Sequence, residues 1–335
     1  MVADDLTGAA DSAAPFVARG MSARVGFGEG CDGDACVVAR STNSRERDPA
    51  SAAAAVTRAA ATFPGETAGV VSFKKVDSLL RGNPRSETEA LLGAWRCTHA
   101  VVAPAFPAMG RTTEAGRQKL WGQPLTAGNC EGQTPDALRA IFGALPCVLC
   151  DALTDEDLDE AVRRNWAEKV LWVGSAGLAA SLARRLGSPR IQECPAPGPV
   201  RSILVVIGSR HPVTLSQVQV LGGMDCGVQA NLATAALRKC GVAVMRARDA
   251  ADWPQLVDAA STVPAECTVL SGGDTAEAVL LRQGTRALEI LGQPWPGIPL
   301  GRAGGGRPWV IVKSGAFGDA QTLRRTVRWL RGGSA

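Results

Sequence analysis

The stretch Cys267-Thr-Val-Leu-Ser-Gly-Gly-Asp-Thr-Ala-Glu-Ala-Val279 combines three local patterns from which the rest of the chain can be interpreted. Residues 268–270 are β-branched or apolar and predict a strand, residues 271–274 are turn formers, and a helical spacing follows. Glycines let backbone N–H groups approach a phosphate, and the N-terminus of a helix adds positive potential. The stretch therefore predicts a phosphate-binding turn, with an ordinary helix cap at Asp274 or Thr275 as the alternative.

A second glycine turn of the same kind, Lys313-Ser-Gly-Ala-Phe-Gly318, follows the apolar run Trp309-Val-Ile-Val312. Open α/β sheets bind ligands beyond the carboxyl ends of their strands. Two glycine turns after two apolar strands therefore favour a nucleotide site at one edge of a sheet.

The length and charge of the chain limit the classes of protein to which it can belong. A chain of 335 residues exceeds the usual size of one domain, so we expect two. The net charge is +4 and no long run of like charge occurs, which predicts neither a nucleic-acid nor a membrane partner. Without an apolar stretch long enough to span a bilayer, or a basic and then apolar leader, we expect a cytoplasmic protein.

The 10 cysteines are scattered, and the one Cys-x-x-Cys pair is Cys147-Val-Leu-Cys150. No second pair completes a zinc site, so we expect reduced thiols and predict no metal-ligating residues.

Strand and helix patterns alternate along the chain, which predicts mainly parallel sheets. The proline-rich residues 187–199 lack periodicity and have the composition of a linker. We therefore expect an α/β fold of two α/β domains, residues 1–195 and residues 200–335, with a ligand cleft between them.

Two adjacent carboxylates, Asp4 and Asp5, follow the short strand pattern Met1-Val-Ala and precede a helical pattern over residues 9–19. This is the position at which open α/β sheets contact ligands. A helix cap beside a solvated neighbour is the alternative.

A dense set of polar groups, Lys74-Lys-Val-Asp-Ser-Leu-Leu-Arg-Gly-Asn83, follows a buried-strand pattern over residues 69–73. Apolar residues interrupt the charges, which favours a substrate loop over a solvated face. Lysine occurs at few positions in this arginine-rich chain, and Lys74, Lys75 and Lys313 lie in the motifs described here. A compact ammonium at these positions is consistent with phosphate binding.

With these motifs the chain resembles the four-carbon acid sugar kinase family, whose members phosphorylate sugar acids such as threonate, erythronate and 3-oxo-tetronate. The matching stretches come in the family's order and cover nearly the whole chain: Ala3-Asp-Asp-Leu-Thr-Gly-Ala9, Lys74 to Asn83, Ala103-Pro-Ala-Phe-Pro-Ala-Met-Gly-Arg111, Val173-Gly-Ser-Ala-Gly-Leu178, Gly208-Ser-Arg-His-Pro-Val-Thr214, Ser271-Gly-Gly-Asp-Thr-Ala276 and Lys313 to Gly318.

The resemblance implies an N-terminal domain that binds a small-molecule sugar acid and a C-terminal domain that binds ATP. By motif, it implies substrate contacts from Asp4, Asp5, Arg45, Lys74, Lys75, Asp77 and Ser78. It implies nucleotide contacts from Ser209, Gly272, Gly273, Asp274, Thr275 and Gly315. A homo-oligomer is compatible with the sequence.

Two departures from the family pattern bear on these expectations. The chain is shorter than is usual between Arg111 and Asp151, which could remove a specificity element. Its first strand begins almost at Met1, which could loosen the anchor of the carboxylate pair; a misassigned start codon would also explain this departure.

The leading hypothesis is an ATP-dependent kinase. Phosphoryl transfer requires a positioned hydroxyl, cations around the phosphates, usually Mg²⁺, and exclusion of water. We expect Asp5 to act as the base that orients the hydroxyl, with Asp77 as the rival. One alternative is a catalytically inactive module that binds a nucleotide or sugar acid. A dinucleotide oxidoreductase is disfavoured because no Gly-x-Gly-x-x-Gly turn with an acidic partner downstream occurs.

Overall fold

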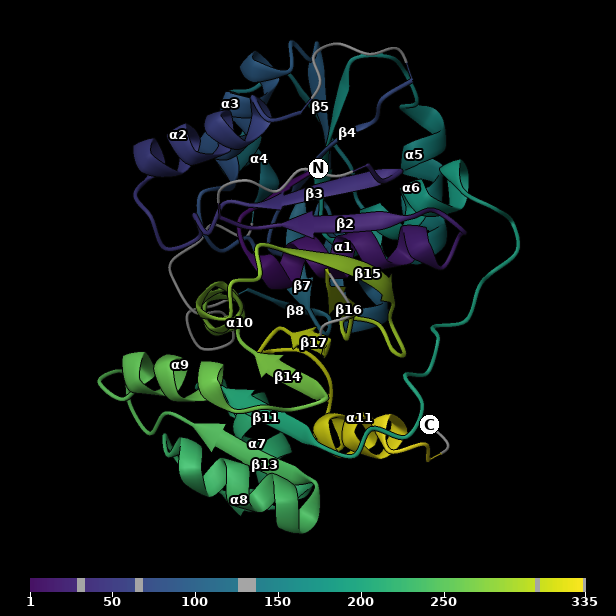
Figure 1. Ribbon diagram of the computed structural model, residues 1–335. Helices are drawn as coiled ribbons and strands as arrows, with labels where there is room; N and C mark the ends of the chain where they lie inside the picture. Colours follow the sequence, from purple (N-terminus) through teal and green to yellow (C-terminus); the bar gives the residue numbers. More distant parts are fainter. Residues whose placement is uncertain (29–33, 64–68, 126–136, 305–307, 334–335) are drawn as a thin grey trace.

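The computed structural model describes residues 1–28, 34–63, 69–125, 137–304 and 308–333. It shows the expected α/β fold, in which helices pack on a large and mostly parallel sheet (Figure 1). Among these residues, every helix is too short or too polar to cross a membrane.

The N-terminal half contributes a parallel portion of the sheet in the order β2-β3-β1-β4-β10-β5-β9. Its strands are β1 (Val2–Ala3), β2 (Ala23–Gly26), β3 (Val37–Ser41), β4 (Ser72–Lys75), β5 (His99–Ala103), β9 (Cys147–Leu149) and β10 (Val170–Gly174). Its helices are α1 (Leu6–Val17), α2 (Pro49–Ala60), α3 (Pro84–Ala94), α4 (Leu138–Phe142), α5 (Asp155–Arg164) and α6 (Ala176–Leu186).

The C-terminal half adds the parallel order β12-β13-β11-β14-β17, after which β16 and β15 run antiparallel. Its strands are β11 (Ile203–Ile207), β12 (Met224–Asp225), β13 (Val242–Arg246), β14 (Cys267–Ser271), β15 (Ala287–Gly292), β16 (Leu300–Ala303) and β17 (Trp309–Lys313). Its helices are α7 (Pro212–Leu221), α8 (Ala230–Cys240), α9 (Trp253–Thr262), α10 (Gly273–Arg282) and α11 (Thr322–Leu330).

The two halves share one sheet, whereas the sequence predicted a sheet for each domain. Strand β15 pairs antiparallel with β2, with Ile290 opposite Ala23 and Ala287 opposite Gly26. This pairing joins the strands into a 14-stranded sheet in which β15 lies beside β2 across the middle of the molecule (Figure 1). Pairing removes an exposed edge from each half, and such edges otherwise promote aggregation. Residues 187–202, which include the predicted linker, contain no helix or strand.

The segment after β5 forms a small separate sheet. A short 3₁₀ helix, η1 (Pro107–Met109), leads into the antiparallel strands β6 (Arg111–Glu114), β7 (Arg117–Leu120) and β8 (Gln123–Pro124). Residues 126–136 lie outside the described residues.

The short strand β1 is held firmly despite its length. It pairs with β3 on one side and β4 on the other, and the Met1 ammonium donates a hydrogen bond of 2.7 Å to the carbonyl of Val38. Both β1 residues are fully buried, as is typical of a central parallel strand. In this structure the short first strand therefore does not loosen the carboxylate pair that follows it.

Candidate functional site

The acidic side of the site lies where three parallel strands end together. Ala3 of β1 is in register with Ser41 of β3 and with Lys75 of β4. Because the strands are parallel, the segments that follow them emerge at the same edge of the sheet. Asp4, Asp5 and the polar loop after Lys75 consequently meet there.

Arg45 is the centre of this acidic cluster. Its guanidinium donates to both oxygens of Asp4, at 2.7 and 3.0 Å, and approaches the oxygens of Asp5 at 2.8 and 3.1 Å. Asp77 Oδ1 lies 3.9 Å from the same guanidinium. Asp4 and Asp5, which are adjacent in the sequence, therefore share Arg45 as a partner.

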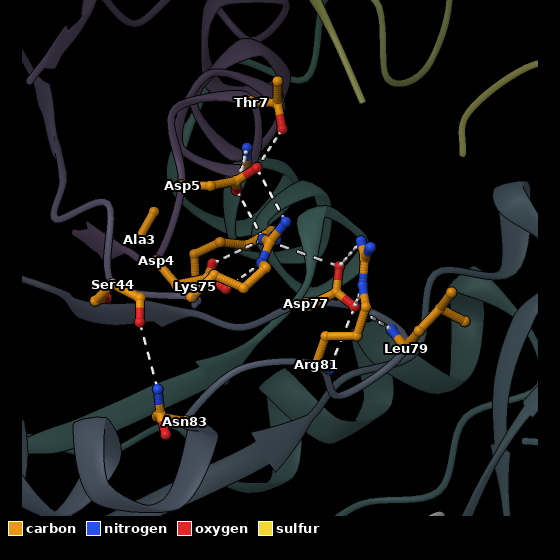
Figure 2. A network of polar contacts seen from close by, with 12 residues as sticks. Ala3, Asp4, Asp5, Thr7, Ser44, Lys75, Asp77, Leu79, Arg81 and Asn83 are labelled. Carbon is orange, nitrogen blue, oxygen red and sulfur yellow. Dashed lines mark hydrogen bonds and ion pairs between the residues drawn. The ribbon is translucent and has the colours of Figure 1, made fainter. Parts of the chain in front are cut away.

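The carboxylate of Asp5 is fixed by the start of α1. Oδ1 accepts the backbone N–H of Gly8 at 2.9 Å, and Oδ2 accepts the hydroxyl of Thr7 at 2.5 Å (Figure 2). Asp5 therefore caps helix α1, which was the alternative reading of the sequence. The cap also fixes the orientation in which the carboxylate of Asp5 faces the rest of the site. For Asp4, burial raises the pKa, but the charges of Arg45, Lys74 and Lys75 together outweigh it and the net pKa is lowered.

Asp77 is occupied by its own loop. Both of its oxygens accept from Arg81, at 2.9 and 3.0 Å, and Oδ2 also accepts the N–H of Leu79 at 3.1 Å (Figure 2). Burial alone would raise the pKa of Asp77, but the charges of Arg81 and Arg45 hold it well below its ordinary value. A carboxylate held in this way is a poor proton acceptor.

The two adjacent lysines of β4 have different surroundings. The ammonium of Lys74 is fully buried and lies 2.7 Å from a carboxylate oxygen of Glu87 in α3. Lys75 Nζ instead lies beside α1, where a Cβ built on Gly8 would fall 2.8 Å from it and 2.5 Å from Asp5 Oδ1. Strand alternation explains the difference, since consecutive side chains point to opposite faces. Lys75 thus joins Asp5 at the site, whereas Lys74 supports the strand from the other face.

The glycine turns lie at the carboxyl ends of three neighbouring strands. Ile207, Ser271 and Lys313 are in register across β11, β14 and β17. The N–H groups of Gly208 and Ser209 donate to the carbonyl of Ser271, and that of Gly272 donates to Lys313. The sequence prediction that two glycine turns share one edge is confirmed, and a third turn joins them.

Close packing requires glycine in these turns. Gly272 has a φ of 107°, which disfavours other residues. A Cβ at position 315 would lie 1.9 Å from Ser209 Oγ, and one at position 208 would lie 1.8 Å from Thr275 Oγ1. Thr275 is further held by a hydrogen bond of 2.8 Å from the indole of Trp253. The turns form a cradle of backbone beside the start of α10, whose first-turn N–H groups lack helical partners and can receive an anion.

The acidic cluster and the glycine turns meet at Gly273, the first residue of α10. A Cβ there would lie 2.7 Å from Asp5 Oδ2. A second contact between the halves follows in α10, where Glu277 accepts the hydroxyl of Ser41 at 2.8 Å. Partial desolvation, with the charge of Asp5 adding to it, raises the pKa of Asp274. Asp5 and Gly273, one from each predicted set, therefore lie side by side.

A cavity of about 750 Å³ opens between residues of the two halves. On the N-terminal side it is lined by Leu79 and Arg111, among others, and on the C-terminal side by His211, Trp295 and Ala316, among others. Its volume lies within the ordinary range for small-molecule sites.

The sequence assigned no role to some residues that lie at the site. One predicted residue, Ser78, makes few contacts there. Thr7 and Gly8 lie within the motif of residues 3–9, and Arg111 is the last residue of the motif of residues 103–111, but no role was predicted for them. The ion pair of Glu87 with Lys74 could not be predicted, because the two residues are not neighbours in the sequence. Ser78 is buried, and its carbonyl accepts from Gln118 at 2.8 Å. No group of three or more His, Cys, Asp or Glu side chains within the described ranges is arranged to hold a metal ion.

Comparisons with known proteins match two different families to the two ends of the chain. A family described as a sugar-binding N-terminal domain matches residues 1–133, and one described as a nucleotide-binding C-terminal domain matches residues 254–323. A D-threonate kinase of Bordetella bronchiseptica is 31% identical over 402 residues, covering 99% of this chain and 97% of the relative.

Two solved structures resemble the chain over nearly its whole length. A Salmonella typhimurium protein has a TM-score of 0.76 at 21% identity, covering 98% of both chains, which shows a shared fold. A Bordetella bronchiseptica protein, solved as a domain-swapped dimer with bound citrate, has a TM-score of 0.50 at 29% identity and covers 100% of this chain and 98% of its own.

Proposed function

Because the chain belongs to the four-carbon acid sugar kinase family, we propose that it transfers a phosphoryl group from ATP to a hydroxyl of a four-carbon sugar acid. The observation that carries the proposal is the contact between Gly273 and Asp5, which brings a glycine-rich phosphate cradle against a fixed carboxylate. Phosphoryl transfer depends on this kind of juxtaposition, since positioning and charge stabilisation provide most of the catalysis.

The glycine turns would hold the phosphates of ATP. The backbone at Ser209, Gly272 and Gly315 would approach the phosphate oxygens, and the N-terminus of α10 would add positive potential. For the backbone to approach a phosphate this closely, the residue must have no Cβ, and glycine meets that requirement.

The carboxylates at the junction fit Mg²⁺. This ion is usually held in nucleotide sites by one or two carboxylates together with substrate phosphates. Asp274, in the first turn of α10, is the acidic group that would hold the ion together with the phosphates. Burial, with the charge of Asp5 adding to it, raises the pKa of Asp274, and a bound cation would offset both effects. When bound, Mg²⁺ would supply charge neutralisation for the phosphates.

Asp5 is the better of the two candidate bases. The hydroxyl oxygen of the acid forms a bond to the γ-phosphorus, the bond from that phosphorus to the β-bridging oxygen breaks to release ADP, and the hydroxyl proton passes to Asp5. Asp77 is held by Arg81 through both oxygens and lies farther along the loop. Lys75, beside Asp5, would stabilise the transferred group, and Arg45 would orient the carboxylate of Asp5.

Lys74 and Ser78 would serve the substrate indirectly. Lys74, through Glu87, holds the strand that presents Lys75, and buried Ser78 lies in the loop that presents Asp77. The citrate in the Bordetella protein supports a carboxylate ligand in this family, and its dimer supports the proposal of a homo-oligomer. A cytoplasmic location remains a prediction from sequence.

The test is ADP release by the purified protein with ATP, Mg²⁺ and a panel of D- and L-threonate, D- and L-erythronate and 3-oxo-tetronate. Reactions without an acid measure background hydrolysis. We expect one acid to raise the rate well above that background. Binding of ATP and of an acid by calorimetry, without turnover for any member of the panel, would instead favour the inactive binding module.

A further inference from the structure

Most cations on the acid-binding side of the site are already neutralised by carboxylates. Arg45 binds Asp4 and Asp5, and Lys74 is paired with Glu87. Arg81 holds Asp77 through two hydrogen bonds. A sugar acid brings its own carboxylate, and none of these three groups is free to receive it.

Arg111 differs from them. Its side chain is buried, and its Nε has no hydrogen-bond partner among the described residues. One terminal nitrogen donates to the carbonyl of Met109. The carboxylates of Asp77 and Asp11 stabilise the charge of Arg111, but burial outweighs them and its pKa is lowered. A buried guanidinium whose charge is only partly offset is costly, which points to a ligand that supplies a closer counter-ion.

The surroundings of Arg111 hold its guanidinium plane in place. Its central carbon lies 5.1 Å from the ring centroid of Phe317, which belongs to the other half of the molecule. Stacking on an aromatic ring leaves the N–H edges of a guanidinium available to a planar partner. Phe317 in turn packs against Phe106 with ring centroids 6.1 Å apart.

Arg111 also lines the cavity of about 750 Å³ between the halves. Leu79, two residues after Asp77, and Ala316, next to Gly315 of the nucleotide cradle, line the same cavity. The cavity thus lies next to the loop that carries Asp77 and to the turn that carries Gly315.

We propose that Arg111 binds the carboxylate of the sugar acid in this cavity and thereby selects acids over the corresponding polyols. The proposal rests on the proposed function, since it assigns one end of that substrate. With the carboxylate at Arg111, the hydroxyl end of the molecule extends toward Asp5 and the phosphate cradle. Burial lowers the pKa of Arg111, and a bound carboxylate would offset that effect by stabilising the charged form.

The experiment compares the kinetics of the full-length wild type, Arg111→Met and Arg111→Lys with the preferred acid and with the matching four-carbon polyol, which lacks the carboxylate. Loss of a bidentate hydrogen bond between charged groups should raise KM for the acid about 10- to 100-fold, with KM for ATP unchanged. The polyol should react equally poorly with wild type and variants. The ratio of kcat/KM for the acid to kcat/KM for the polyol should therefore fall by the factor by which KM for the acid rises.

Arg302→Lys is the matched control, because Arg302 also stacks on an aromatic ring, 4.1 Å from the centroid of Trp309, at the opposite end of β17. Melting temperatures establish that each variant is folded. Should Arg111→Met not fold, Arg111→Lys keeps the charge and the stem but cannot bind bidentately.

A folded Arg111 variant with unchanged KM for the acid, or with equal losses for acid and polyol, would overturn the proposal. Wild-type protein that consumes no ATP with any acid refutes the proposed function instead.

Discussion

Gly273 and Asp5, which are 268 positions apart in the sequence, lie so close together that a Cβ on the glycine would fall 2.7 Å from an oxygen of the carboxylate. No carbon atom is tolerated at that distance without movement of one partner. The start of α10 and the cap of α1 are thus a single structural unit, and a change at either position should affect both ligands.

Gly273→Val tests this unit. The new side chain must displace either the carboxylate of Asp5 or the start of α10, and overpacking of this kind costs about 1–3 kcal/mol. We expect ATP affinity to fall about 10- to 100-fold and kcat to fall with it, measured by calorimetry and by turnover. Gly93→Val is the control, because a Cβ at exposed position 93 meets no atom within 4 Å. Unchanged nucleotide affinity in folded Gly273→Val would show that the turn is only structural.

Asp5→Asn should lower kcat about 10²- to 10⁴-fold while both ligands still bind, because asparagine keeps the cap but accepts no proton. Asp48→Asn is a matched control, since Asp48 caps α2 with hydrogen bonds of 3.0 and 3.1 Å but is exposed to solvent. The rates are measured at saturating ATP and acid. Near-normal kcat in Asp5→Asn together with a large loss in Asp77→Asn would transfer the role of base to Asp77.

Lys74→Met should destabilise the fold by about 3–5 kcal/mol, because it leaves the carboxylate of Glu87 buried without its counter-ion. The double variant Lys74→Met/Glu87→Leu should recover much of that loss. Denaturant unfolding of the three proteins measures the difference. If Lys74→Met is as stable as wild type but has a raised KM for the acid, Lys74 contacts substrate directly.

Asp11 should make stability depend on pH. Burial raises its pKa from 3.8 to about 7, with the charge of Asp5 adding to the effect and that of Lys75 opposing it. The folded state therefore binds a proton that the unfolded chain releases between pH 4 and 7, so this residue's contribution to stability falls as pH rises through that window. Relative to wild type, Asp11→Asn should gain about 2–4 kcal/mol between pH 4 and pH 8. A pH-independent difference between the two unfolding free energies would contradict the assignment.

Local sequence patterns predicted much of the fold. The strand, turn and helix at residues 267–279 form as β14 and α10, and the parallel strands follow the apolar runs. The hairpin of β15 and β16 was missed, because Ala287–Gly292 is short and its pairing with β2 is set by tertiary contact rather than by local propensity.

The sequence predicted which residues lie at the site better than it predicted the contacts between them. The residues after β1, β4 and β14 could be identified because they follow strand ends. The capture of both Asp4 and Asp5 by Arg45 depends on a loop conformation that no periodicity encodes. Lys74 and Lys75 point to opposite faces of β4, as consecutive residues of a strand do. This could have been predicted, but both lysines were assigned to the loop that follows the strand.

The pairing of β15 with β2 has a consequence for how the molecule can be divided. A protein cut at the linker would part these strands and leave a row of unpaired N–H and carbonyl groups on each fragment. The linker therefore does not mark a point at which two self-sufficient pieces separate. Two bodies that swing freely on a tether would have to break this pairing.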